Sequence, residues 1–184
     1  MKKNLFSCLL LLFCASGVFV SCGDDDEKTT VGYSGKDISG DVELVRDQET
    51  KKAVLKVSSD KAWELYSGST AEDIDQNTPV MSEDGKGSFD ISVDAGKRSV
   101  FLFKTAEGQA LLAERLLPVT AYNFRDLGGI KNKEGKFVRW GKLFRTDEMN
   151  KMTDADLTYL ASTGLKTVVD FRTATEKEGG FGGM

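Results

Sequence analysis

The sequence predicts an all-β N-terminal domain, an antiparallel sandwich of the immunoglobulin-like kind, followed by an incomplete α/β segment. Between residues 41 and 118, short runs of alternating apolar residues recur between turn residues. This stretch of about 78 residues is long enough to enclose one core. Between residues 153 and 171, a helical pattern, a glycine and a short apolar run follow one another, which is the order of half an α/β unit.

The chain begins with the pattern of a secretion signal over residues 1–21. Lys2 and Lys3 precede a mainly apolar stretch at 5–20, which is shorter than the ~20 residues that a transmembrane helix requires. Cys22 follows between small residues. This setting resembles the cleavage site of bacterial lipoproteins, in which the cysteine becomes the lipid-carrying first residue. A plain secretory signal and an uncleaved anchor are the alternatives.

Residues 22–40 are predicted to be an acidic tether and linker, because a run of acids at 24–27 leads into a polar stretch. Cys8 and Cys14 lie within the predicted signal. The processed chain would then have no disulfide or free thiol, and its stability would depend on a packed core. A lipid anchor at Cys22 predicts a place in a bacterial cell envelope, on a periplasmic or a surface-exposed membrane face.

Charge and composition exclude several classes of function. The formal net charge is −4 at pH 7, and the loss of Lys2 and Lys3 with the signal makes it −6. An acidic chain without a basic stripe is a poor partner for nucleic acid. The chain contains no histidine, which excludes a Ser-His-Asp triad, a Cys-His pair and a histidine-ligated zinc ion.

The predicted β-sandwich domain spans residues 41–118. Its expected strands lie at 42–44, 53–57, 63–65, 89–93, 99–104 and 111–117. Trp63 and Tyr66 could form a platform for a carbohydrate ring, but an inward position in a strand favours a core role for Trp63.

A motif at 125–129 combines charge with a tight turn. Arg125 and Asp126 directly precede Leu-Gly-Gly, and adjacent glycines permit a backbone reversal there. Arg125 either braces the turn by pairing with Asp126 or binds an anionic substrate, and the residues alone leave both open. A hairpin is expected at 130–140.

A helix is predicted from 153 to 162. Thr153 is a good N-cap residue in front of an acidic first turn. Leu157, Leu160 and Ala161 fall on one face at helical spacing. Gly164 stands where a C-cap glycine belongs.

A strand is predicted at 165–171, with Asp170 and Arg172 at its carboxyl end. In open α/β sheets, ligands bind beyond the carboxyl ends of the strands. Asp170 and Arg172 are therefore candidate site-lining residues, and a salt bridge at the strand end is the alternative.

Four pieces of sequence stand in a particular order. They are N-F-R-D-L-G-G at 123–129, G-K-L-F-R-T-D at 141–147, G-L-K-T-V-V-D-F-R at 164–172, and Glu176. Together they resemble the bacterial tyrosine/serine protein phosphatases, a cysteine-dependent family related to the dual-specificity group. The resemblance covers about residues 116–178.

The resemblance implies hydrolysis of a phosphorylated protein or another phosphomonoester by a cysteine thiolate, without a metal ion or other cofactor. It makes Arg125, Asp126, Asp170 and Arg172 the candidate residues that support the substrate site. Residues 119–178 would be the start of the phosphatase domain, and a glycine-rich tail follows at 179–184.

The family's nucleophile lies in a loop of the form H-C-x-x-G-K-D-R-T-G, and this chain has no cysteine after Cys22. We therefore expect the chain to be the front portion of a phosphatase, with no catalytic residue present and no activity as given. The alternative is a non-enzymatic surface lipoprotein whose β-sandwich binds a protein or glycan partner.

Overall fold

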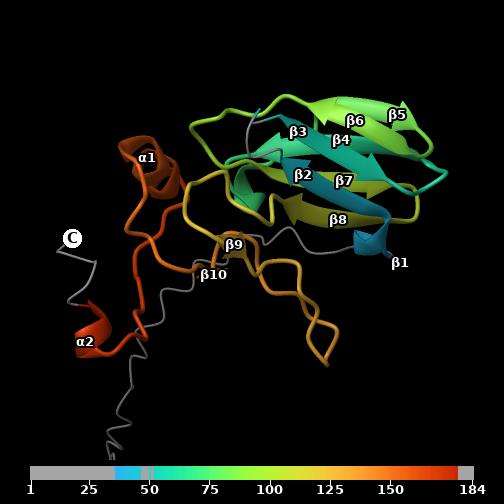
Figure 1. The fold of residues 1–184 in the computed structure, drawn as a ribbon. Coiled ribbons are helices and arrows are strands. Elements are labelled where there is room, and N and C mark those ends of the chain that lie inside the picture. Colours follow the sequence, from blue (N-terminus) through green and yellow to red (C-terminus); the bar gives the residue numbers. More distant parts are fainter. Residues whose placement is uncertain (1–35, 47–49, 51, 178–184) are drawn as a thin grey trace, which may run out of the picture.

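A computed structural model describes residues 36–46, 50 and 52–177 (Figure 1). The predicted signal at 1–21, the predicted lipidation site Cys22, most of the predicted acidic tether and the glycine-rich tail at 179–184 lie outside the described residues. No helix among the residues described is long and apolar enough to cross a membrane. The described chain is mostly β-structure with few helices, as the sequence predicts for its N-terminal part.

Two β-sheets form the larger part of the molecule. In spatial order, the five-stranded sheet consists of β1 (Lys36–Asp37), β8 (Gly108–Ala113), β7 (Val100–Thr105), β4 (Ala62–Gly68) and β5 (Met81–Asp84). The three-stranded sheet consists of β2 (Val42–Arg46), β3 (Ala53–Val57) and β6 (Gly87–Ile91). Two short 3-10 helices, η1 (Ser39–Asp41) and η2 (Ala71–Asp73), lie in the connections.

One apolar core lies between these sheets. Alternate residues of the inner strands point into it, so that Leu55 of β3, Leu65 of β4 and Phe103 of β7 belong to the same buried cluster. Trp63 is 2% exposed and its Nε1 donates to the carbonyl oxygen of Gly85 at 3.0 Å. Trp63 is therefore a core residue, and a carbohydrate-stacking role for it is ruled out.

The prediction of a purely antiparallel domain is wrong at one edge. Strand β1 runs parallel to β8, with Lys36 paired to Gly108, so the five-stranded sheet is mixed. The direction of β1 follows from its connection, because η1 then carries the chain across to β2 in the other sheet. Strand β5 lies in a stretch of polar residues that carried no apolar alternation to predict it.

The C-terminal part is built of short elements around a second, smaller core. Its elements are β9 (Arg125–Asp126), β10 (Phe144–Arg145), α1 (Asp154–Ser162) and α2 (Ala174–Lys177). Strands β9 and β10 pair antiparallel. The core joins Leu117 and Val119 to Phe124, Tyr159 and Leu160. Because Leu117 and Val119 share this core, the predicted boundary at residue 118 is not marked by a break in packing and stays a prediction.

The hairpin expected at 130–140 is present. Lys131 and Phe137 form an antiparallel bridge, and the Val138 amide donates to Ile130 at 2.9 Å. The turn at 133–136 contains Gly135 at φ +80°, a conformation that favours glycine.

Helix α1 confirms the predicted cap but buries a different face. Thr153 and Asp156 form a reciprocal capping box at its start. Leu160 is buried as expected, whereas Leu157 and Ala161 are exposed. Asp156 and Tyr159 are buried instead, because Asp156 accepts a hydrogen bond from Thr120 and Tyr159 donates one to Glu114.

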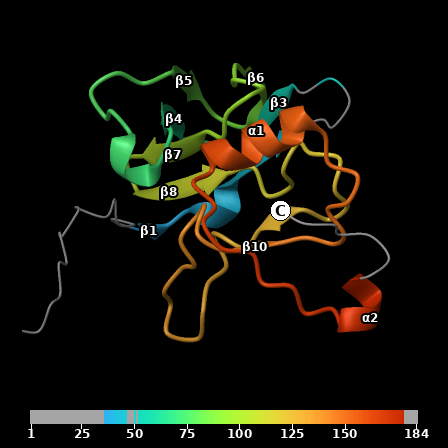
Figure 2. The same cartoon turned by 90° about the vertical axis from the view of Figure 1, so that its left-hand side faces the viewer.

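The strand predicted at 165–171 does not form, and this part of the prediction is wrong for the described residues. The segment is extended and exposed, with Phe171 at 94%. A parallel strand is normally covered on both faces and flanked by other strands, and no sheet of the described residues supplies such neighbours. Figures 1 and 2 both show the chain leaving the body of the molecule after α1, with α2 standing apart.

Candidate functional site

The two parts of the chain meet at a buried ionic contact. Arg98 precedes β7, and its Nη2 donates to Oδ2 of Asp126 in β9 at 2.5 Å and to the carbonyl oxygen of Glu114 at 3.1 Å. Arg98 is 5% exposed and Asp126 is fully buried. A buried charge is tolerated only when it is paired and hydrogen-bonded, so this contact ties the family-like motif to the β-sandwich.

A second buried pair lies beside the first. Arg46 of β2 pairs through Nε with the Glu114 side chain, and the Tyr159 hydroxyl of α1 donates to the other Glu114 oxygen at 3.3 Å. Burial raises the pKa of Glu114, although Arg46 acts against this shift. Burial and the nearby Glu114 charge also raise the pKa of Tyr159. Glu114 thereby connects the sandwich with helix α1.

Asp126, one of the predicted site residues, holds two turns in place. Its Oδ1 accepts from the Gly128 amide and its Oδ2 from the Gly141 amide, both at 2.7 Å. The carboxylate is directed into the protein, and both of its oxygens are engaged by the fold. In this structure, Asp126 therefore positions the backbone at Gly128 and Gly141.

The glycines of the motif make room for Trp140. A Cβ on Gly128 would come within 2.5 Å of the Trp140 backbone, and one on Gly129 within 2.6 Å of its ring. The indole Nε1 donates to the carbonyl oxygen of Leu111 in β8 at 2.8 Å. Arg115 lies 5.1 Å above the ring. Leu-Gly-Gly thus fixes an aromatic side chain against the sandwich.

Arg125 does not pair with Asp126. Neighbouring residues of a strand point to opposite faces, and Arg125 of β9 is half-buried on the other face. Its Nη2 donates to Oδ1 of Asn123 at 2.9 Å, and Asn123 adopts φ +54°, which asparagine tolerates better than most residues. The alternative in which Arg125 braces the turn with Asp126 is therefore wrong.

Asp170 and Arg172 are brought together by a local salt bridge. Nη2 of Arg172 lies 2.8 Å from Oδ2 of Asp170, and its Nε donates to Oδ1 at 3.0 Å. This forked geometry is a strong form of the pair. The pair lies on the exposed segment after α1, as the salt-bridge alternative predicted, although no strand precedes it.

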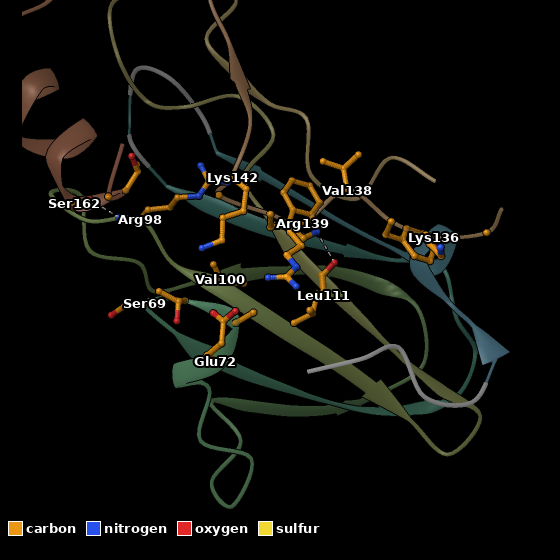
Figure 3. Close-up of a pocket in the computed structure, with 18 residues that line it drawn as sticks. Ser69, Glu72, Arg98, Val100, Leu111, Lys136, Val138, Arg139, Lys142 and Ser162 are labelled. Carbon is orange, nitrogen blue, oxygen red and sulfur yellow. Dashed lines mark hydrogen bonds between the residues drawn. The ribbon is translucent and has the colours of Figure 1, made fainter. Parts of the chain in front are cut away.

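A cavity of about 670 Å³ lies where the two parts meet (Figure 3). The sandwich contributes one wall through Glu72, Val100 and Leu111. The end of the hairpin and the residues directly after it contribute the other through Arg139, Trp140 and Lys142. None of the four residues predicted from the sequence lines it.

The cavity carries positive charge. Arg139 and Lys142 are exposed and form no ion pair within the described residues, whereas Lys136 at the rim pairs with Glu134 at 2.9 Å. In Figure 3 the Arg139 guanidinium and the Lys142 amino group turn into the same space, with Glu72 across from them. Sequence reasoning missed these residues because no local pattern relates 139–142 to residues 72 and 98.

Among the described residues, no group of three or more histidine, cysteine or acidic side chains is placed to hold a metal ion. The arrangement can bind an anion by charge and by hydrogen bonds from arginine and lysine.

Comparisons with known proteins show what the C-terminal part of the chain is similar to. Residues 118–181 match the model of the tyrosine phosphatase family. A protein of Cupriavidus necator, assigned by its name alone to the tyrosine-protein phosphatases, is 45% identical over 58 residues. That alignment covers 32% of this chain and 21% of the relative, so the chain spans about a fifth of the length of that relative. No solved structure matches the chain. Residues 118–181 are therefore similar to the tyrosine phosphatase family.

Proposed function

We propose that this chain is the leading part of an exported, lipid-anchored tyrosine/serine protein phosphatase that hydrolyses phosphomonoesters with a cysteine thiolate. The observation that carries the proposal is the family match over 118–181, within which the motifs stand in the family's order. The match to only about a fifth of the relative supports a longer functional protein.

The residues of this chain would act as supports for that chemistry. In the family, the thiolate attacks phosphorus, backbone amides and an arginine hold the phosphate oxygens, and an aspartate protonates the leaving group. Asp126 would position the backbone around the site, and Arg125 would present its half-buried guanidinium to an anionic substrate. Asp170 and Arg172 would line the site as a pair.

The α/β fold of the segment belongs to the same proposal. Val168, Val169 and Phe171 are apolar and exposed among the described residues, which supports a strand that forms only when further strands flank it. The facing sheets with one shared core likewise support an immunoglobulin-like sandwich at 41–118.

Export and anchoring rest on the N-terminal sequence pattern. We expect a clickable palmitate analogue to label the chain in cells and the Cys22→Ser variant to remain unlabelled. Equal labelling of both would contradict lipidation at Cys22. A processed, unlabelled wild-type chain would indicate the plain secretory signal.

The enzyme assignment is tested first by sequencing the coding DNA past codon 184 in all three frames. We expect a loop of the form H-C-x-x-G-K-D-R within about 100 codons, the size of a domain remainder. The completed chain should hydrolyse p-nitrophenyl phosphate, and the cysteine-to-serine variant of that loop should not. If no frame carries the loop, the phosphatase proposal is overturned and the alternative, a surface lipoprotein that binds a protein or glycan, replaces it.

A further inference from the structure

We propose that the cavity where the two parts of the chain meet is a binding site for an organic anion. Its charged end would lie between Arg139 and Lys142, and its apolar body would lie on Val100, Leu111 and Trp140. This proposal is independent of the phosphatase chemistry, because every residue that it needs lies in the described chain and binding requires no turnover.

The balance of charge around the cavity indicates that the charged end of the ligand is anionic. Its lining contains four cationic residues and a single acid, Glu72. Two of the cations are already engaged, because Arg98 pairs with Asp126 and Lys136 with Glu134. Arg139 and Lys142 have no such partner among the residues described. Together they match one anionic group with donors on two sides.

The apolar walls of the cavity indicate that the ligand has an apolar body. Val100 is buried at the start of β7, and Leu111 and Trp140 are partly buried beside it in one cluster. The cavity volume of about 670 Å³ lies within the roughly 300–1,000 Å³ typical of small-molecule sites. A cavity of this size with apolar walls and two cations favours an amphiphilic anion over a bare inorganic ion.

The backbone next to the two cationic residues is held in place before any ligand arrives. Trp140 is fixed by its hydrogen bond to Leu111 and by the close approach of Gly128. The next residue, Gly141, donates its amide to the buried Asp126. Arg139 and Lys142 flank these two anchored residues, so the backbone on either side needs little ordering upon binding.

The test uses phenyl phosphate, inorganic phosphate and phenol as probes of the full chain. Trp63 is buried in the core, so changes in tryptophan fluorescence report on Trp140. We expect saturable binding of phenyl phosphate that weakens with added salt, with weaker binding of the other two probes. Inorganic phosphate binding as tightly as phenyl phosphate would overturn the proposal, as would the absence of saturable binding.

Variants locate the site. The double variant Arg139→Gln, Lys142→Gln should weaken phenyl phosphate binding by about tenfold or more, because it removes two charge-assisted contacts. The matched control Lys56→Gln, Lys151→Gln makes the same charge change at exposed positions outside the cavity and should leave binding unchanged. Equal losses in both double variants would contradict the assignment.

A third variant moves affinity in the opposite direction. Glu72→Gln removes the one opposing charge and should tighten phenyl phosphate binding by about twofold or more, which a misfolded protein could not do. Unchanged or weaker binding would count against the proposed geometry. A phosphotyrosyl peptide that binds more tightly than phenyl phosphate would identify a protein as the source of the anion, and the reverse order a free metabolite.

Discussion

Asp126 belongs to a motif typical of phosphatases, yet both of its carboxylate oxygens are used by the fold. One oxygen holds the Gly128 amide, and the other is shared by Arg98 and the Gly141 amide. A carboxylate so engaged acts by positioning its neighbours. The motif therefore has a structural role in this chain that is visible in its hydrogen bonds.

Replacing Asp126 with alanine should strongly destabilise the protein. The change leaves the Arg98 charge buried without its partner and frees two backbone amides. Breaking a buried ion pair typically costs about 3–5 kcal/mol. We expect the free energy of unfolding in urea to fall by about that amount. The control Asp60→Ala, in an exposed pair with Lys86, should change it little. Equal losses would contradict the buried contact.

Gly128 is the residue at which the motif meets Trp140. An alanine Cβ there would lie 2.5 Å from the Trp140 backbone, so the two segments must separate. Overpacking of this kind typically costs about 1–3 kcal/mol. We expect Gly128→Ala to lower the free energy of unfolding by that amount and to shift the tryptophan emission spectrum.

Gly40 offers the matched control, since an added Cβ meets nothing within 4 Å there. Gly40→Ala should leave the emission spectrum unchanged. An unshifted spectrum in Gly128→Ala would show that Trp140 does not pack on this glycine.

At the scale of elements, prediction from sequence succeeds where the signal is local. Alternating apolar residues located six of the strands in the two sheets, and the sequence around Thr153 located the start of α1, because these patterns depend on neighbours a few residues away. The prediction of a strand at 165–171 failed, because a buried strand needs neighbouring strands that its own residues cannot supply. The cavity was missed for the related reason that its walls come from distant parts of the chain.

The cap of α1 should make stability depend on pH. Burial alone would raise the pKa of Asp156, but hydrogen bonds from Thr120 and Thr153 hold it below its ordinary value. Because the folded-state pKa is lowered, the stabilisation is fully present above the unfolded pKa of about 3.9. It is lost as the pH falls through the lower, folded-state pKa.

The measurement compares wild type with Asp156→Asn in urea unfolding at several pH values. The difference in the free energy of unfolding should be constant above about pH 5 and shrink as the pH falls below 3.9. Thr158→Ala in the same helix carries no titrating group, so its difference from wild type should not vary with pH. A gap between wild type and Asp156→Asn that widens in acid would refute the assignment.

At the scale of the whole molecule, the chain behaves as a packed body with an exposed end. The β-sandwich and residues 117–162 share the buried ionic contact between Arg98 and Asp126 and form opposite walls of one cavity. Residues 165–173 carry exposed apolar side chains without regular structure. Figure 2 shows this segment leading away from the sheets toward α2. Resistance to unfolding should therefore differ sharply on the two sides of Gly164.

Limited proteolysis should detect that difference. Among the bonds between residues 52 and 177, we expect the first cuts at 165–173, which leave a product that still contains α1. Mass spectrometry of the early products identifies the cut sites. First cuts near residues 118–121 would mean that the C-terminal part is only loosely attached to the sandwich.

The pairing of Arg98 with Asp126 limits how these parts can be recombined. Arg98 belongs to the β-sandwich, and Asp126 belongs to the motif at 125–129. Replacing the residues after 118 with an unrelated domain would leave the buried Arg98 without the aspartate that it pairs with. A working chimera must therefore either keep an acid at the equivalent place or replace Arg98 with an apolar residue. The β-sandwich is thus specific for the C-terminal part that it now carries, and it cannot be joined unchanged to an unrelated domain.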